Sequence, residues 1–261
     1  MKVSGAVALV TGGASGIGKA ICQKFLENGG KVCIVDIQDE IGVATAKTFS
    51  DAFSSDDVIF AHCDVTKQDS LKAAFDKAIA AYGKLDIVCN NAGIFSENEW
   101  EKTIQINIVG VIRGMKLAIE HMGIQHGGNG GVIVNTSSIG GLYPQPMGPT
   151  YSATKAAVSM YTKSMSMLHG EKQGVRINAI CPALVDTQLV DMTCRDSAVP
   201  EEEVRALLGQ LKSIKPADVA DAVLQLITDD TKNGTLLQVF PSGLEEFQYS
   251  ELPFSKIMQT M

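Results

Sequence analysis

Short apolar runs alternate along the chain with longer segments in which apolar residues recur at helical spacing. Residues 7–10 form the first run, Val-Ala-Leu-Val, and a helical pattern follows over residues 17–26. This alternation is typical of buried parallel strands joined by crossover helices. Further strands are predicted at residues 31–36, 58–62, 85–89, 132–135, 175–181 and 235–240. Further helices are predicted at residues 39–53, 70–82, 99–122, 150–169 and 218–227.

The order of these elements predicts an α/β fold, in which residues 1–261 form a single doubly wound Rossmann-type domain. Its seven-stranded parallel sheet is expected to carry helices on both faces. Residues 186–215 are polar and irregular, and we expect a substrate lid there or, alternatively, a helix pair that packs on the core. Residues 241–261 are expected to form a C-terminal tail.

Composition limits the class of partner. Hydrophobic residues make up 45% of the chain and charged residues 20%, which is a globular profile. The 22 Lys and Arg residues against 29 Asp and Glu residues give a formal charge of −7. Because nucleic acids and anionic membranes bind basic surfaces, neither is expected as a partner. The sequence shows no signal-peptide pattern and no apolar run of ~18 residues.

The cysteines and histidines lack the spacing of metal sites. No Cys-x-x-Cys pair occurs, and the four histidines are scattered. We therefore expect no metal ion, and instead free, buried, reduced thiols in a cytoplasmic setting. The cysteines are Cys22, Cys33, Cys63, Cys89, Cys181 and Cys194.

The first predicted strand leads directly into a glycine-rich turn, Thr-Gly-Gly-Ala-Ser-Gly-Ile-Gly, over residues 11–18. Glycine permits a tight turn and a close approach of the backbone to a pyrophosphate, and the N-terminus of the following helix favours negative charge. The turn therefore predicts a dinucleotide site, although a glycine run alone also fits an ordinary loop. The cofactor-binding residues predicted here are Gly12, Ser15, Gly16, Ile17 and Gly18.

Asp36 ends the second predicted strand, where a Rossmann fold places an acid for the adenosine ribose hydroxyls. A carboxylate there repels a 2′-phosphate, and the nearby Ser15 and Ile37 are uncharged. We therefore expect NAD rather than NADP as the cofactor, with Asp36 and Ile37 among the residues that bind it. The alternative is that Asp36 is only the polar end of a strand.

Tyr151 and Lys155 are four residues apart in a predicted helix, so their side chains share one face. A lysine ammonium close to the phenol stabilises the phenolate, so we expect a lowered Tyr151 pKa and a usable base. Ser138 follows the fifth strand at the carboxyl edge of the sheet, where its hydroxyl is expected to donate to a substrate oxygen. A solvated helix face and a turn serine are the alternatives.

Together these motifs resemble the short-chain dehydrogenase/reductase superfamily over about residues 5–240. The resemblance implies a catalytic group of Asn107, Ser138, Tyr151 and Lys155, in which Asn107 kinks its helix and holds a water that links Lys155 to solvent. It also implies a homodimer built on the helices that carry Asn107 and Tyr151. Further residues implied to contact the cofactor are Asp64, Val65, Asn91, Ala92, Gly93, Tyr151, Lys155, Pro182, Val185 and Thr187.

Two departures from family patterns concern the nicotinamide and the substrate. Ala183 stands where the superfamily usually has a glycine after Pro182. Residues 98–107 resemble the NAD-dependent 15-hydroxyprostaglandin dehydrogenases, a branch with a substrate-holding glutamine three residues before the tyrosine. Here that position is Gly148. The predicted substrate residues are Ser138, Gly148 and Tyr151, and prostaglandin specificity is put in doubt.

The apolar residues of the lid and tail predict a lipid-like or bulky apolar alcohol, consistent with a role in prostaglandin or other lipid metabolism. These tail residues are Phe247, Tyr249, Leu252 and Phe254, and the expected opposite wall is Leu142, Tyr143, Pro144 and Met147. NAD-dependent oxidation of a secondary alcohol is the main hypothesis. An NADP-dependent carbonyl reductase and a non-catalytic NAD-binding protein are the alternatives.

Overall fold

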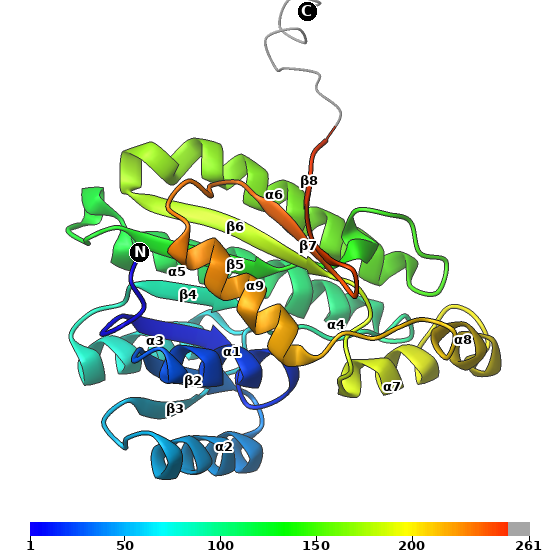
Figure 1. Ribbon diagram of the computed structural model, residues 1–261, viewed down its shortest axis with the longest axis horizontal. Helices are drawn as coiled ribbons and strands as arrows, with labels where there is room; N and C mark the ends of the chain where they lie inside the picture. Colours follow the sequence, from blue (N-terminus) through cyan, green and yellow to red (C-terminus); the bar gives the residue numbers. More distant parts are fainter. Residues whose placement is uncertain (250–261) are drawn as a thin grey trace, which may run out of the picture.

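The computed structural model describes residues 1–249, apart from the side chains of residues 170 and 171. These residues form an eight-stranded sheet with the strand order β3-β2-β1-β4-β5-β6-β7-β8 (Figure 1). The strands are β1 (Val7–Thr11), β2 (Lys31–Asp36), β3 (Val58–His62), β4 (Ile87–Asn90), β5 (Gly131–Thr136), β6 (Val175–Pro182), β7 (Leu236–Phe240) and β8 (Gly243–Phe247). The α-helices are α1 (Gly16–Glu27), α2 (Asp39–Ala52), α3 (Gln68–Tyr82), α4 (Trp100–Ile104), α5 (Val111–Met122), α6 (Pro149–Gln173), α7 (Gln188–Arg195), α8 (Glu201–Leu208) and α9 (Pro216–Thr228).

The seven parallel strands expected from the sequence are confirmed, and β8 is an addition to them. It runs antiparallel to β7, pairing Leu236 with Phe247, after a reversal that ends at Gly243 with a φ of +132°. The predicted tail therefore starts with an edge strand. Most side chains of β8 are exposed, which removes the apolar run that marks the other strands. Leu252 and Phe254 lie outside the described residues.

Helices cover both faces of the sheet because successive strand residues point to opposite sides. In β1, Ala8 and Val10 belong to the core beneath α1 and α9, which lie side by side in Figure 1. Val7 and Leu9 belong to the core beneath α3, α5 and α6. The sheet is thus buried on both faces, which explains its near-continuous apolar strands.

The strand order reverses at β1, which lies between β2 and β4. In an open α/β sheet, the loops that leave such neighbouring strands at their carboxyl ends diverge to opposite faces and open a crevice. The glycine-rich turn leaves β1 at this point, and the loop of residues 91–99 leaves β4 beside it. The fold therefore places both predicted cofactor motifs at one edge.

The predicted helix over residues 99–122 is interrupted. A π-helical segment, η1 (Gln105–Gly110), joins α4 to α5. Asn107 lies within η1, and its buried side chain is hydrogen-bonded to both backbone groups of Ile94, at 2.9 Å each. Local π-turns are frequent at functional sites. This one turns a helical residue towards the loop after β4, and it is the irregularity that the family resemblance implied at Asn107.

Residues 186–213 leave the sheet and return at one point. A parallel bridge pairs Val185 with Ile214, and the backbone bond from Asp186 N to Ile214 O measures 3.0 Å. Between these ends the predicted irregular segment contains two helices, α7 and α8, at the carboxyl end of the sheet (Figure 1). Cys194 and Val204 pack between the two helices. The alternative of a helix pair is therefore confirmed for this segment. The same two helices also line a cavity.

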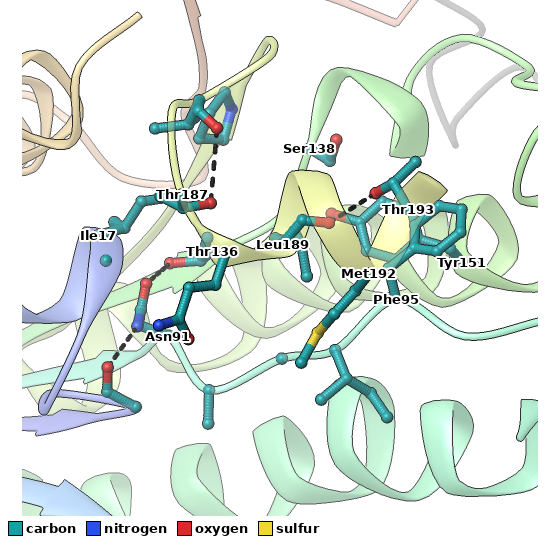
Figure 2. Close-up of a pocket in the computed structure, with 18 of the residues that line it drawn as sticks. Ile17, Asn91, Phe95, Thr136, Ser138, Tyr151, Thr187, Leu189, Met192 and Thr193 are labelled. Carbon is teal, nitrogen blue, oxygen red and sulfur yellow. Dashed lines mark hydrogen bonds between the residues drawn. The ribbon is translucent and has the colours of Figure 1, made fainter. Parts of the chain in front are cut away.

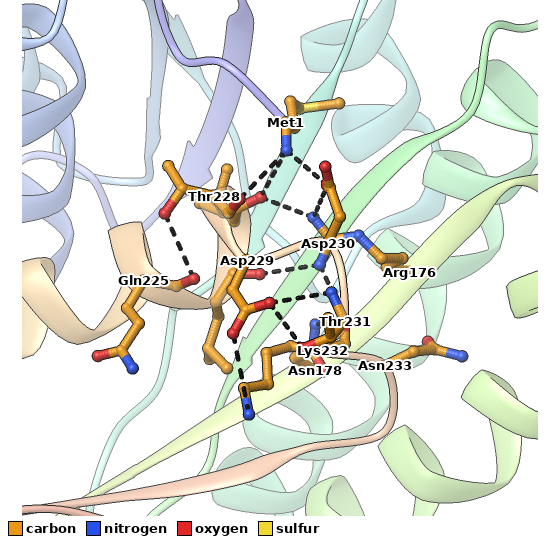
Figure 3. Close-up of polar contacts among 12 residues, drawn as sticks. Met1, Arg176, Asn178, Gln225, Thr228, Asp229, Asp230, Thr231, Lys232 and Asn233 are labelled. Carbon is orange, nitrogen blue, oxygen red and sulfur yellow. Dashed lines mark hydrogen bonds and ion pairs between the residues drawn. The ribbon is translucent and has the colours of Figure 1, made fainter.

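Cations cap the C-terminal end of α9 (Figure 3). The Arg176 guanidinium donates to the carbonyls of Leu226 and Ile227, at 2.9 and 2.6 Å, and to that of Lys232, at 2.8 Å. The Met1 ammonium contacts the Ile227 carbonyl as well. Positive charge is favourable at this end of a helix, where carbonyls lack intrahelical partners. These contacts fasten α9 to the start of β6.

All six cysteines are buried and free, as predicted. Burial raises the pKa of Cys33 and Cys89 to about 12, so these thiols stay protonated. Within residues 1–249, no helix combines the length and the apolar character that a membrane crossing needs.

Candidate active site

A cavity of about 670 Å³ opens along the carboxyl ends of β1, β2, β4, β5 and β6 and continues under α7 and α8. Figure 2 shows Ile17 and Asn91 in one part of it, and Ser138, Tyr151 and Met192 in another. Among the predicted site residues, Gly18, Asn107 and Gly148 do not line it. Those that line it are Gly12, Ser15, Gly16, Ile17, Asp36, Ile37, Asp64, Val65, Asn91, Ala92, Gly93, Ser138, Tyr151, Lys155, Pro182, Val185 and Thr187.

The glycine-rich turn leaves the N-terminus of α1 open to the cavity. Gly12 and Gly16 have φ values of +63° and +52°, which favour glycine. Ser15 caps α1 without any side-chain hydrogen bond, so the first helical N–H groups remain available to a ligand. A Cβ at Gly18 would lie 2.1 Å from the Gly12 carbonyl oxygen. Gly18 therefore permits the tight turn and does not itself face the cavity.

Asp36 is buried at the end of β2, and its carboxylate points back to the turn. Its two oxygens accept backbone N–H groups, Oδ2 from Ala14 and Oδ1 from Gln38, both at 3.1 Å. If Asp36 were only the polar end of a strand, its carboxylate would instead face solvent. Ile37, next to it, is exposed and lines the same part of the cavity.

Two threonines that the sequence analysis missed hold the loop after β4. The Thr11 hydroxyl accepts the N–H groups of Asn91 and Ala92, at 3.0 and 3.1 Å. The Asn91 side chain donates to the Thr11 carbonyl at 3.0 Å. It also accepts from the Thr136 hydroxyl at 3.2 Å (Figure 2). The Asn91 side chain thus links the ends of β1 and β5 by hydrogen bonds, at the floor of the cavity. Each threonine ends its strand, which is the signal that could have identified them.

Tyr151 and Lys155 lie on one face of α6, as their spacing predicts. The Lys155 ammonium lies 5.6 Å from the centroid of the Tyr151 ring and donates to the Thr136 carbonyl at 2.8 Å. Both side chains are buried. Ser138 stands at the end of β5, and its hydroxyl accepts the Gly140 N–H at 3.1 Å. The three predicted residues therefore meet in the cavity.

The expected lowering of the Tyr151 pKa is wrong for this arrangement. Burial raises the pKa of Tyr151 to about 12, and the facing Ser138 hydroxyl only partly opposes the shift. Burial also lowers the pKa of Lys155 to about 8, against the influence of Cys181. Desolvation is the largest cause of both shifts, because burial removes the hydration of each charged form.

Asn107 lies behind the predicted catalytic group. Its side-chain amide donates to the Thr154 hydroxyl at 3.1 Å, in addition to its bonds with Ile94. A Cβ at Gly93 would lie 3.3 Å from both Asn107 Oδ1 and Lys155 Nζ. Gly93 therefore separates the amide from the ammonium, and its lack of a side chain lets both approach the loop.

Gly148 does not contact the cavity, contrary to its predicted role as a substrate residue. A Cβ there would lie 2.5 Å from Phe95 Cε2 and 3.3 Å from Tyr151 Cβ. Phe95, which the sequence analysis missed, lines the cavity instead. The apolar ring takes the space that a side chain at position 148 would need.

The part of the cavity under α7 and α8 is mostly apolar, as the lid composition predicts. Of the expected opposite wall, only Met147 lines it, while Tyr143 donates to Gln238 on β7. Phe247 and Tyr249 of the tail also lie elsewhere, because Phe247 packs on Tyr143 with ring centroids 6.0 Å apart and on Tyr249 with centroids 5.0 Å apart. The apolar lining comes from Ile94, Phe95, Met147, Leu184, Leu189, Val190, Met192, Leu208 and Leu211.

Comparison with known proteins agrees with this geometry. The family model described as short chain dehydrogenase matches residues 6–197. The 15-hydroxyprostaglandin dehydrogenase [NAD(+)] of Bos taurus is 39% identical, over 99% of this chain and 100% of its own. Zerumbone synthase of Zingiber zerumbet is 36% identical, over 89% and 91%. A short-chain dehydrogenase/reductase from Burkholderia phymatum in complex with NAD superposes with a TM-score of 0.80 at 26% identity, covering 90% of each chain. The protein therefore belongs to the short-chain dehydrogenase family.

Proposed function

We propose that the protein is an NAD-dependent dehydrogenase that oxidises an apolar secondary alcohol to a ketone. The observation that carries this proposal is the convergence of Ser138, Tyr151 and Lys155 in the cavity that also holds Asp36 and the open N-terminus of α1. The two halves of this cavity differ in chemistry. The cofactor half offers backbone N–H groups and a carboxylate, and the other half offers apolar side chains next to the Tyr151 phenol.

The cofactor half fits NAD. The open helix N-terminus suits a pyrophosphate, and the fixed Asp36 carboxylate suits ribose hydroxyls and repels a 2′-phosphate. A Cβ at Gly12 would lie 3.0 Å from Ala92 Cα, so this part of the floor is closely packed backbone. Bound NAD supplies the hydride acceptor. The named relative from Bos taurus carries NAD(+) in its own name, which supports the choice of cofactor.

The catalytic residues have distinct roles in this proposal. The Ser138 hydroxyl orients the substrate oxygen, and the Tyr151 phenolate removes the hydroxyl proton. Lys155 holds positive charge beside the phenolate from its anchor on the Thr136 carbonyl. Because the Tyr151 pKa is raised by burial, ionisation of the phenol limits the rate at neutral pH. Activity should therefore rise as the pH increases above 7, up to the Lys155 pKa of about 8, above which the lysine loses its charge.

The cavity favours a neutral substrate over a carboxylate. Among the lining residues that the structure describes, Lys155 is the one cation, and Asp36, Asp64 and Asp186 are the anions. A carboxylate bound under α7 and α8 would lack a charge partner and lose its hydration. We therefore propose an uncharged lipid-like or terpenoid-like alcohol, or a hydroxy acid whose carboxylate stays in solvent.

A matched panel tests the proposal. Purified protein is incubated with NAD or NADP and with secondary alcohols that include a 15-hydroxy prostaglandin, hydroxy fatty acids and their methyl esters, and NADH or NADPH formation is followed. We expect turnover with NAD and a lower KM for each ester than for its acid. Tyr151→Phe should abolish turnover while NADH binding, followed by fluorescence, persists. Full activity of that variant would contradict the mechanism, and binding without any turnover would favour a non-catalytic protein.

The exposed apolar side chains of α6 support a homodimer. Met160 and Met167 are 52% and 83% exposed, and Leu168 is 54% exposed, whereas Met165 is buried. We propose that α6, with α5 beside it, forms the contact between two copies. Light scattering during gel filtration tests this: Met167→Lys should yield monomer if the helix forms the interface.

A further inference from the structure

The first turn of α6 is capped by a residue from another part of the chain. Helix α6 starts at Pro149, which has no N–H group, after Gly148, which has no side chain to cap it. The Glu97 carboxylate takes that role: Oε2 accepts the Thr150 N–H at 3.1 Å, and Oε1 accepts the Tyr151 N–H at 3.0 Å. Both N–H groups belong to the turn that lacks intrahelical acceptors.

The same residue contacts the end of α7 through its backbone. The Glu97 N–H donates to the Asp196 carbonyl at 2.8 Å. The next residues, Ser197 and Ala198, donate from Oγ and N to the Met147 carbonyl, at 2.8 and 2.9 Å. The segment that follows α7 is therefore hydrogen-bonded to two loops beside the start of α6. One is the loop that carries Glu97, and the other is the loop that leads into α6 and Tyr151.

Glu97 itself is held in place by its neighbours. The Ser96 carbonyl accepts the Thr103 hydroxyl at 2.8 Å, and the Ser96 hydroxyl accepts the Glu99 N–H at 2.9 Å. Phe95 packs on the Tyr151 ring. Residues 95–97 thus contact the catalytic tyrosine twice, through its ring and through its backbone, and they also contact the lid.

We propose that Glu97 is a positioning residue that couples the position of the α7–α8 lid to the placement of Tyr151. This inference rests on the proposed dehydrogenase function for its kinetic consequence, and on the geometry alone for the coupling. Tyr151 lies in the first turn of α6, where no intrahelical bond fixes its N–H group. Without the carboxylate, that turn loses two charge-assisted hydrogen bonds, and the phenol moves away from the substrate hydroxyl.

Hydrogen exchange tests the coupling without any turnover. Glu97→Ala is compared with the wild type and with Glu99→Ala, a matched control whose carboxylate is 60% exposed and pairs with Lys102. We expect faster exchange in the peptides that cover residues 149–155 and 196–198 in Glu97→Ala, and no change in the control. Faster exchange in only one of the two peptides, or in neither, would overturn the coupling.

Kinetics test the positioning role. Glu97→Ala should lower kcat between about 10-fold and 100-fold, the range that misplacement of a catalytic group produces. NADH affinity should stay within about twofold, since the side chain does not contact the cofactor half. Glu97→Gln, which keeps one acceptor oxygen, should recover part of kcat. A uniform loss of NADH affinity and kcat, or no recovery with Gln, would show a merely structural role.

A double-mutant cycle with Ser197→Ala addresses the lid directly. Ser197→Ala removes one bond between the lid and Met147, and its effect on kcat should be smaller in the Glu97→Ala background than in the wild type. Strictly additive effects would contradict the coupling. If the wild type turns over no alcohol, the proposed function fails, and the exchange experiment still decides whether Glu97 links the two segments.

Discussion

The aromatic rings of Phe95 and Tyr151 pack against each other with their centroids 4.9 Å apart. The Phe95 ring also fills the space beside Gly148, where a Cβ would come within 2.5 Å of it. Phe95, in the loop after β4, therefore has two effects. Its ring forms part of the environment of the Tyr151 phenol, and it restricts which residue fits at position 148. A glutamine at position 148 is incompatible with Phe95 in this position.

Gly148→Gln should therefore lose most of its activity, because the new side chain displaces Phe95 and with it Tyr151. Phe95→Ala should restore part of that activity when combined with Gly148→Gln, since it removes the clash. The measurement is kcat/KM of both single variants and the double variant, together with thermal unfolding to exclude collapse of the fold. Equal loss in Gly148→Gln with and without Phe95→Ala would show that the clash is not the cause.

The buried lysine makes the stability of the cofactor-free protein depend on pH. The Lys155 pKa is lowered from 10.5 to about 8, so the unfolded chain binds more protons than the folded one between these values. Stability should therefore rise with pH from about 8 to 10.5 relative to Lys155→Met, by at most roughly 3 kcal/mol. Urea unfolding of both proteins at pH 7.5, 9 and 10 measures the difference. If the free energies of unfolding of the two proteins changed with pH in parallel, Lys155 would have to be hydrated in the folded protein.

Asp36 should control the choice of cofactor. Asp36→Ala removes a carboxylate that accepts two backbone N–H groups and that we propose binds the ribose hydroxyls, so NADH affinity should fall about 10-fold to 100-fold. NADPH should be affected less, because the repulsion of its phosphate disappears. Fluorescence titration measures both affinities. Asp39→Asn is the control, since Asp39 is an exposed acid that contacts His62. Equal losses for the two cofactors would argue against a role in discrimination.

Gln145 should set the preference for a second polar group on the substrate. Its half-buried side chain lines the apolar part of the cavity and lies against Gly140, two residues from Ser138. Gln145→Leu should raise KM for alcohols with another oxygen near the carbinol and leave KM for simple apolar alcohols unchanged. Steady-state kinetics with matched pairs of alcohols test this. A uniform change across both classes would show that the amide serves only packing.

The strands, the doubly wound order and the cofactor motifs were predictable because each depends on local pattern. The glycine turn, Asp36 and the Tyr151–Lys155 spacing are short-range features, and the fold brings them to one edge once the strands are parallel. β8 was missed because most of its side chains are exposed, so it has no continuous apolar run. The two lid helices were predicted only as an alternative because each has eight residues, too short for a clear periodic signal.

Contacts between distant segments were not predictable. Glu97 and Tyr151 are joined across 54 positions of sequence, and no local pattern marks an acid that caps another helix. The Phe95–Gly148 packing is of the same kind. The Tyr151 pKa was assigned the wrong direction because spacing shows that a lysine is near, whereas the cost of burial depends on the surrounding fold.

The bridge between Val185 and Ile214 gives the lid segment a common point of exit and return. The ends of such a segment are already closed on each other, so exchanging its interior costs little additional loop entropy. Within it, residues 199–213 can be exchanged as one cassette, while Thr187 beside the glycine-rich turn and the bonds of residues 196–198 to the start of α6 are kept. In evolutionary terms, this lets the cavity wall that α8 forms diverge between relatives, while the segments that contact the glycine-rich turn and the start of α6 are retained.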